Sequence, residues 1–567
     1  MDRRKRQAIM GTLIVLFIIT IAISAILIKK LTPSKKVMDL TDYYQIKGEE
    51  IVVVLQNDIH ETKGILKGNQ IYINYNTVVE YLNPRFYWDE KENILIYTTP
   101  NEIIKSDAAS QDYFINKSKN TVEYPITKVD GDNVYIALDF VKMYSDLKYE
   151  VYKDPNRVVI DYKWGEYLYA SVKKKTQLRY KPDIKSDILV QLKEGQKVEF
   201  VDSGESAVEG FSKVITEDGV IGYVKTKYVK NSYYEVTESN FKEPEYTSIH
   251  KDYKINLAWH QVTNQTANNN LLYMLEAVKG VNTISPTWFS VISEDGELSS
   301  LASERYVERA HDLGIEVWAL VDDFNPDINM YNLLSVTSKR EKLINNLIAY
   351  GIQYNLDGIN IDFEKVSLDT GVHFIQFIRE LSVKCRNNGI ILSVDNYVPT
   401  AYSAYYNREE QGNVVDYVIT MAYDETHGGS EKSGSVASYN FVKSGVENTL
   451  KEVPKEKVII GIPFFTRLWK ETPEGEGVKV TSQAYGMKEA ANVLDRNDAK
   501  IVWDEELKQN YGEFEEDGAT FKMWLEDEQS LEAKLKVISD NDVAGVAAWK
   551  LGLEDKGIWN TIIKYIN

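Results

Sequence analysis

Three polar residues at alternate positions have the types and the spacing for acid–base chemistry. The stretch 356–366 reads LDGINIDFEKV, and Asn360, Asp362 and Glu364 alternate in it with apolar residues. Successive side chains of a strand point to opposite faces, so the three polar groups would share one face. A neighbouring carboxylate raises the pKa of an acid, which keeps it protonated near neutral pH and able to act as a general acid. We interpret the stretch as an inner barrel strand ending in catalytic acids, rather than a solvated edge strand with chance acids.

Strand-like and helix-like patterns alternate from residue 253 to the end of the chain. The expected strands are 255–259, 281–285, 317–321, 358–364, 391–396, 417–423, 458–463 and 546–549. Eight β/α units predict a (β/α)8 barrel, the TIM-barrel α/β fold. The gap between the last two strands is longer than one crossover helix needs, and it predicts a small α+β insertion at about 470–525 that walls one side of a cleft.

Two more strand ends carry side chains suited to a substrate. Barrel enzymes place their reactive groups at the carboxyl ends of the strands. The sixth strand ends in TMAYDETHGG, which brings Met421, Tyr423 and Asp424 to the same rim as the two acids. The eighth strand ends at Trp549, whose indole suits the apolar face of a sugar ring.

Five landmarks in order resemble glycoside hydrolase family 18, a family of chitinase-like barrel enzymes. DGINIDFE matches the family signature DGxDxDxE, MAYD matches its MxYD motif, and GIPFFTRLW, TFKMWLEDEQSLEAKL and GVAAWKLG match further landmarks. The resemblance covers residues 253–567 and is greatest to peptidoglycan-cleaving N-acetylglucosaminidases of spore-forming bacteria. It implies a retaining mechanism in which the acetamido oxygen of the substrate attacks the anomeric carbon and forms an oxazolinium intermediate.

The resemblance also implies a role for each rim residue. Glu364 would protonate the glycosidic oxygen and then activate water, Asp362 would hold the acetamido N–H, and Tyr423 would donate its hydroxyl to the acetamido oxygen. Further substrate contacts are expected from Asn360, Met421, Asp424, Trp549, Asn396 and Trp288. Four aromatic residues could line sugar subsites or fill the barrel: Trp259, Trp288, Phe464 and Trp469. We expect His260 and His427 to satisfy loop hydrogen bonds, and neither a metal nor another cofactor is implied.

Asn360 departs from the family pattern, which often has aspartate there. An asparagine can hydrogen-bond Asp362 but carries no charge. We therefore expect Asp362 to ionise more readily here, so that the pH–rate profile differs from that of an Asn360→Asp variant. Because Asp362 and Glu364 are both kept, an active enzyme is expected rather than a non-catalytic glycan-binding barrel.

Residues 37–163 contain an internal repeat. The stretch from Gly68 aligns with the stretch from Gly131, and each has a short strand (71–73, 134–136), a helix-like run and strands around a turn. Such repetition predicts a duplicated α+β module, and its pattern resembles the module named after the N-terminal domain of copper amine oxidases. We expect a spacer or wall-binding role without copper, because His60 is the only histidine of the region and one imidazole is not a metal site.

Residues 165–230 are rich in short β-patterns. The turn Asp218-Gly219 lies between alternating apolar runs, which predicts a hairpin. With Leu178-Arg179, Pro182 and Gly222-Tyr223-Val224, the segment resembles a bacterial Src-homology-3-like domain, a small β-barrel that in its family often binds cell-wall peptides. A passive spacer is an equal alternative. The polar stretch 231–252 lacks periodicity and predicts a linker.

Residues 8–28 are almost continuously apolar and follow four basic residues, so residues 1–36 are expected to form a cytoplasmic tail and a transmembrane anchor. A weak cleavage site at Ala22-Ile23-Ser24 leaves a signal peptide as the alternative. Lysines on the other flank balance the basic residues, so the charge rule does not set the orientation. The expected substrate sets the orientation instead. We expect a single-pass protein of the cell membrane with its catalytic domain on the wall side.

The charge and the cysteine count of the chain limit the classes of partner and site that it can have. The formal charge of −19 on 567 residues argues against nucleic acid, which needs a basic face. Cys385 is the only cysteine, so no internal disulfide or zinc cluster can form, and its helical context predicts a core position. The expected partner is an N-acetylglucosamine-containing polysaccharide, peptidoglycan first and chitin as the alternative, bound by a multidomain monomer.

Overall fold

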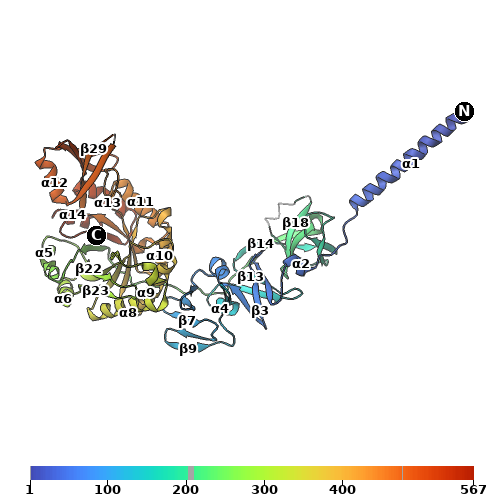
Figure 1. Cartoon of the computed structure of the whole chain (residues 1–567), viewed down its shortest axis with the longest axis horizontal. Coiled ribbons are helices and arrows are strands. Elements are labelled where there is room, and N and C mark those ends of the chain that lie inside the picture. The colour runs from blue at the N-terminus through green and yellow to red at the C-terminus, as the bar shows by residue number, and fades with distance from the viewer. Residues whose placement is uncertain (1, 202–207, 209, 476, 567) are drawn as a thin grey trace. The chain divides into compact units, whose positions relative to one another are not determined.

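The computed structural model describes residues 2–201, 208, 210–475 and 477–566. The chain forms two compact units (Figure 1). The first consists of Met1–Phe86, Ser106–Tyr113 and Lys119–Glu243, and the second of Tyr87–Lys105, Phe114–Ser118 and Pro244–Asn567. The second unit contains the predicted site and is described first.

The predicted (β/α)8 barrel is confirmed. Its eight parallel strands are β21 (Ile255–His260), β22 (Thr283–Val291), β24 (Glu316–Asp322), β25 (Gly358–Asp362), β26 (Ile391–Tyr397), β27 (Tyr417–Met421), β28 (Val458–Pro463) and β34 (Gly545–Trp549). They pair in chain order, and β34 pairs with both β28 and β21, which closes the sheet. The larger helices between them are α6 (Glu304–Asp312), α8 (Thr337–Gln353), α9 (Gly371–Asn387), α10 (Arg408–Val414), α11 (Tyr439–Thr449) and α13 (Glu528–Asp540), and α14 (Ile558–Ile566) follows the last strand.

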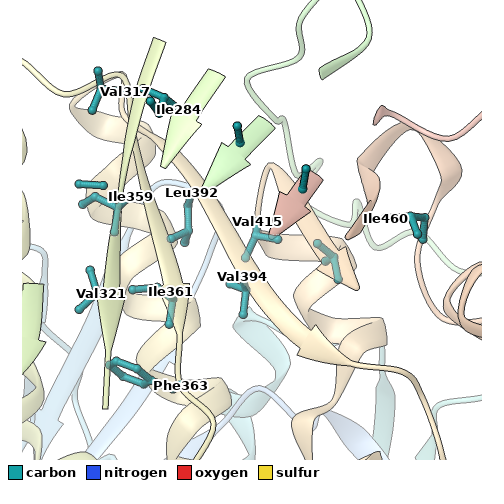
Figure 2. Close-up of a cluster of buried hydrophobic side chains, with 14 of the residues drawn as sticks. Ile284, Val317, Val321, Ile359, Ile361, Phe363, Leu392, Val394, Val415 and Ile460 are labelled. Atoms are coloured by element: carbon teal, nitrogen blue, oxygen red, sulfur yellow. The ribbon is translucent and has the colours of Figure 1, made fainter. Parts of the chain in front are cut away.

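Strand alternation divides the apolar side chains of the barrel into two cores. Ile359, Ile361 and Phe363 belong to the outer core between sheet and helices, together with outward residues of neighbouring strands (Figure 2). A separate inner core contains Trp259, Trp318 and other inward side chains of the strands. Asn360 and Asp362 therefore point into the barrel, as the period of two predicts. The predicted core position of Cys385, on α9, is confirmed because this residue is buried.

The predicted insertion between the seventh and eighth strands is also present. It consists of a five-stranded antiparallel sheet in the order β30-β29-β33-β32-β31 and the helix α12 (Met487–Arg496). The strands are β29 (Phe465–Glu474), β30 (Gly477–Gly486), β31 (Lys500–Asp504), β32 (Gln509–Glu516) and β33 (Ala519–Trp524). One face of this sheet packs on α12 around Leu494 and Met523.

The first unit contains the internal repeat. Its short strands become β4 (Gln70–Asn74) and β11 (Asn133–Ala137), which pair antiparallel with Ile73 opposite Ile136. Their sheet runs β10-β11-β4-β3-β1-β13-β12, with β1 (Glu50–Leu55), β3 (Gly64–Lys67), β10 (Thr127–Asp130), β12 (Lys148–Tyr152) and β13 (Arg157–Asp161), and β2 (Asp58–Ile59) pairs with β1. The first strands of the two copies thus pair in one sheet, which also contains β12 and β13 of the second copy.

A second, seven-stranded sheet follows in the same unit, in the order β16-β15-β19-β18-β17-β14-β20. Its strands are β14 (Gly165–Val172), β15 (Thr176–Arg179), β16 (Ile188–Leu192), β17 (Lys197–Phe200), β18 (Phe211–Thr216), β19 (Ile221–Lys225) and β20 (Val229–Thr237). The hairpin predicted at Asp218-Gly219 joins β18 to β19. The predicted linker start at residue 231 is wrong, because β20 continues to Thr237 by pairing along β14. The Src-homology-3-like assignment stays a prediction.

The N-terminal helix α1 (Arg3–Leu31) has no buried residue. Among the described residues it is the one helix long and apolar enough to cross a membrane, with a mean hydropathy of 2.8.

A segment of the predicted N-terminal module belongs to the barrel unit. Strands β5 (Tyr87–Asp89) and β6 (Ile94–Thr98) pack on the barrel helices. Helix α8 has no capping side chain of its own at Val336. Instead, Asp89 Oδ2 accepts hydrogen bonds from Thr337 N at 2.6 Å and from Thr337 Oγ1 at 2.5 Å. A buried carboxylate 248 residues away in sequence therefore caps the helix.

We expect Asp89→Ala to lower the free energy of unfolding of the barrel by about 2 kcal/mol, because it leaves Thr337 N and Oγ1 without their buried acceptor. The matched control is Glu90→Ala, since Glu90 is adjacent and exposed. Urea unfolding followed by tryptophan fluorescence measures both variants. Equal midpoints for the two would contradict the cap.

Candidate active site

Asn360, in the middle of β25, is fully buried and makes three side-chain hydrogen bonds. Its Oδ1 accepts from Trp259 Nε1 and from Ser285 Oγ, each at 3.0 Å. Its Nδ2 donates to Asp395 Oδ1 at 2.8 Å. The expected hydrogen bond from Asn360 to Asp362 is therefore wrong, and the amide faces the neighbouring strand β26. Asn360 thus holds three other side chains inside the barrel, and its contact with a substrate stays a prediction.

Asp362 ends β25 and is 4% exposed. Burial raises its pKa well above the ordinary range, and the carboxylates of Asp395 and Glu364 raise it further. The expectation that Asp362 ionises more readily than it would beside an aspartate at position 360 concerns the Asn360→Asp variant, and it stays a prediction. A carboxyl group that position 360 lacks is present at Asp395 of the next strand, where it accepts from Asn360.

Glu364 lies just beyond the strand and is half-buried. The loop that carries it is fixed by Asp323, which follows β24: Asp323 Oδ1 accepts from Glu364 N and Oδ2 from Lys365 N, both at 2.9 Å. The hydroxyl of Tyr397 donates to Glu364 Oε2 at 2.5 Å. Burial raises the pKa of Glu364, the Tyr397 hydrogen bond lowers it, and the nearby Asp424 raises it. The net direction is upward, which suits a general acid.

We expect Tyr397→Phe to shift the alkaline limb of the activity profile to higher pH by about one unit. The hydroxyl stabilises the charged form of Glu364, so its removal raises the pKa and preserves the protonated acid at higher pH. The pH dependence of kcat/KM measures this. Tyr402→Phe is the control because Tyr402 is 92% exposed; an unchanged limb in Tyr397→Phe would refute the assignment.

Tyr423 follows β27 and is half-buried. Burial raises its pKa well above the ordinary range, and the carboxylates of Asp362, Asp395 and Glu364 raise it further, so its hydroxyl keeps its proton and can donate. The ring lies edge-on to Trp259 at 6.4 Å between centroids, and Trp259 in turn contacts Trp549 at 5.9 Å. Gly461 makes room for this contact, since a Cβ there would lie 3.2 Å from Tyr423 and 3.3 Å from Trp259.

The remaining predicted substrate contacts divide into two groups. Asp424 is exposed and Trp549 is half-buried, while Met421 is buried at the end of β27. Asn396 and Trp288 are each 1% exposed. Asn396 Nδ2 donates to Gln411 of α10 at 2.8 Å, and Trp288 Nε1 donates to Asn268 at 2.9 Å. Both side chains are held within the protein interior, and their role as substrate contacts stays a prediction.

The other aromatic candidates are also interior residues. Trp259, Phe464 and Trp469 are almost completely buried, which favours the barrel-filling alternative. His260 contacts the hydroxyl of Tyr306 through Nδ1 at 2.8 Å, and His427 Nδ1 accepts from Gly429 N at 3.2 Å. His427 therefore has the loop hydrogen bond expected from sequence, whereas His260 bonds a residue of α6 that is 46 positions away.

Three residues of the site were not predicted: Asp323, Asp395 and Tyr397. Strand alternation contained the signal for Asp395, because Ile391 belongs to the inner core and residues 393 and 395 share its face. Tyr397 is the next inward position of β26. Asp323 lies beyond the last residue of β24, and only its distant partners at residues 364 and 365 identify its function.

Comparison with known families and proteins agrees with this geometry. Residues 310–554 match the glycosyl hydrolases family 18, and residues 53–161 match the copper amine oxidase N-terminal domain. The uncharacterized glycosylase YvbX of Bacillus subtilis is 25% identical over 315 residues, which cover 53% of this chain and 89% of that protein. The cortical fragment-lytic enzyme of Bacillus subtilis is 24% identical over 235 residues, 40% of this chain.

The chain spans only 54% of the cortical fragment-lytic enzyme. Among solved structures, a C-terminal domain from Desulfitobacterium hafniense matches with a TM-score of 0.51 at 23% identity, over 56% of this chain and 100% of that domain. This likeness supports the barrel fold. The homologues of the barrel are thus glycosidases, some of them cortex-lytic.

Proposed function

The chain carries a glycosyl hydrolase family 18 domain homologous to cortex-lytic glycosidases, and on that premise we propose that it cleaves β-1,4 bonds of an N-acetylglucosamine-containing glycan. The reaction retains the anomeric configuration and is assisted by the 2-acetamido group of the substrate. Peptidoglycan is the proposed substrate, and the chain acts outside the cell from a membrane anchor.

The observation that carries the proposal is the grouping of Glu364, Asp362 and Tyr423 at the carboxyl ends of β25 and β27. Glu364 is half-buried with a raised pKa, so it can protonate the leaving oxygen. Asp362 lies two residues behind it on the same face and accepts the acetamido N–H. Tyr423 keeps its proton and donates to the acetamido oxygen, which is thereby oriented towards the anomeric carbon.

The positive charge that develops on the substrate during the reaction supports these separate roles of Asp362 and Glu364. The oxazolinium ring carries a positive charge, and a buried carboxylate at Asp362 stabilises it more strongly than one exposed to water would. Glu364 remains available to the leaving oxygen because Asp323 fixes its backbone and Tyr397 its carboxylate. No protein nucleophile is needed.

Peptidoglycan is favoured over chitin by the homology to a cortical fragment-lytic enzyme. The test is mass spectrometry of the products that the full chain, in detergent micelles, releases from purified wall glycan and from chitin oligosaccharides. We expect wall fragments that end in reducing N-acetylglucosamine. If only chitin oligosaccharides yield fragments, chitin and not peptidoglycan would be the substrate. If neither glycan is cleaved, the proposed function is refuted.

The proposed anchor is α1, whose apolar surface is entirely unburied. Protease added to intact protoplasts is expected to remove the barrel and to leave a membrane-bound fragment that contains α1. Full protection of the barrel would place it inside the cell, and a barrel released into the medium without protease would indicate a cleaved signal peptide.

A further inference from the structure

The orientation of the Asn360 amide is fixed by its partners. An indole Nε1–H can only donate, so the atom that meets Trp259 Nε1 must be the amide oxygen. Ser285 Oγ lies against the same atom. The amide nitrogen is therefore directed at Asp395, and Oδ1 of that carboxylate is the acceptor. Asn360 thus holds Asp395 in place from within the barrel.

Asp395 lies beside Asp362. Strands β25 and β26 are parallel, with Asn360 level with Ser393 and Ile361 level with Val394, so the next pair along this register is Asp362 and Asp395. Both side chains point into the barrel, and they are 4% and 2% exposed. Within the described part of the chain, Asp362 Oδ1 and Asp395 Oδ2 are buried oxygens without a hydrogen-bond partner.

Two adjacent buried carboxyl groups cannot both be ionised without a large electrostatic cost, whereas one proton held between them supplies a donor for both unpartnered oxygens. The other groups that act on the pair have the same sign: Glu364 beyond β25, and Asp322 and Asp323 at the end of β24. Burial raises the pKa of Asp395 as well, although the Asn360 hydrogen bond opposes this.

We propose that Asp395 is a positioning residue that shares one proton with Asp362, and that it replaces, from the neighbouring strand, the carboxylate that position 360 lacks. At rest the proton is on Asp362 Oδ1 and is donated to Asp395 Oδ2. When the acetamido N–H approaches Asp362, the proton transfers to Asp395 Oδ2, and Asp362 becomes the anion that accepts the N–H and faces the oxazolinium charge. One O–H bond breaks and one forms, without any other reactant.

This inference rests on the proposed function for its catalytic consequence, and its first test uses activity. We expect Asp395→Asn to lower kcat by 10- to 100-fold and to move the acidic limb of the pH profile downward by about one unit, because Asp362 loses the neighbouring charge that helps it to keep its proton. The double variant Asn360→Asp/Asp395→Asn restores a carboxylate beside Asp362 and is expected to recover at least tenfold in kcat. Ser393→Ala, on the same strand face, is the control.

A purely structural role of Asp395 predicts no recovery in the double variant, and that result would overturn the proposal. A second test does not need turnover. Infrared difference spectroscopy of the wild-type chain labelled with 13C-aspartate is expected to show a protonated carboxylic acid at neutral pH that disappears in Asp362→Asn. Absence of this band in the wild type would also overturn it. If the band is present but no glycan is cleaved, the shared proton stands and the proposed function fails.

Discussion

Replacing Glu364 with glutamine is expected to reduce kcat on wall glycan by about 10³-fold, while the fold and the affinity for glycan are kept. Glutamine has nearly the same shape as glutamic acid but has no proton to give to the glycosidic oxygen. Its amide can still meet the hydroxyl of Tyr397, so the loop fixed by Asp323 stays in position.

Initial rates of reducing-end release measure this effect, and Glu308→Gln is the matched control because Glu308 is an exposed glutamate on α6. The control is expected to match the wild type. Activity within tenfold of the wild type in Glu364→Gln, with an unchanged unfolding temperature, would mean that another group is the acid.

The largest expected effect on stability comes from the buried ion pair of Lys534 and Glu526. Both side chains are 0% exposed, and Lys534 Nζ lies 2.6 Å from each carboxylate oxygen. Gln509 of the insertion donates to the same carboxylate at 2.8 Å, so the pair joins α13 to β32. We expect Lys534→Met to lower the free energy of unfolding by about 3–5 kcal/mol, because it leaves a buried carboxylate without its cation.

The loss in free energy of unfolding caused by Lys534→Met, called the deficit below, should depend on pH. Burial raises the pKa of Glu526 to about 7 even with Lys534 present, and removal of the cation raises it further. A pKa above that of the unfolded chain favours folding at low pH, so the deficit should shrink as pH falls towards 5 and grow above 7. Urea unfolding at several pH values measures it. Lys536→Met, which breaks an exposed pair with Asp540, is the control and is expected to change stability by less than about 0.5 kcal/mol.

The barrel and its acids were predictable because they depend on local patterns. Period-two alternation identified the strands, and the rule that chemistry lies at their carboxyl ends brought Asp362, Glu364 and Tyr423 together. The same alternation places Asn396, one position from the inward Asp395, on the outer face towards α10. On β22 the pairing register shifts between Thr287 and Phe289, so the orientation of Trp288 could not be read by counting.

Contacts between distant segments were not predictable. The cap that Asp89 provides to α8 joins residues 248 positions apart, and neither segment alone shows it. Likewise, the carboxyl group of Asp395 lies beside Asp362 but comes from another strand, so the DGINIDFE motif alone does not show it. A missing charge in a motif therefore has to be judged from every strand that faces the same interior.

In the proposed reaction, the substrate's own acetamido group performs the nucleophilic step at a site formed by Glu364, Asp362 and Tyr423. The most direct test compares the rate at which the full chain cleaves purified wall glycan before and after chemical N-deacetylation of its glucosamine residues. We expect rapid cleavage of the N-acetylated glycan and no cleavage beside a deacetylated sugar. Equal rates on the two glycans would contradict it.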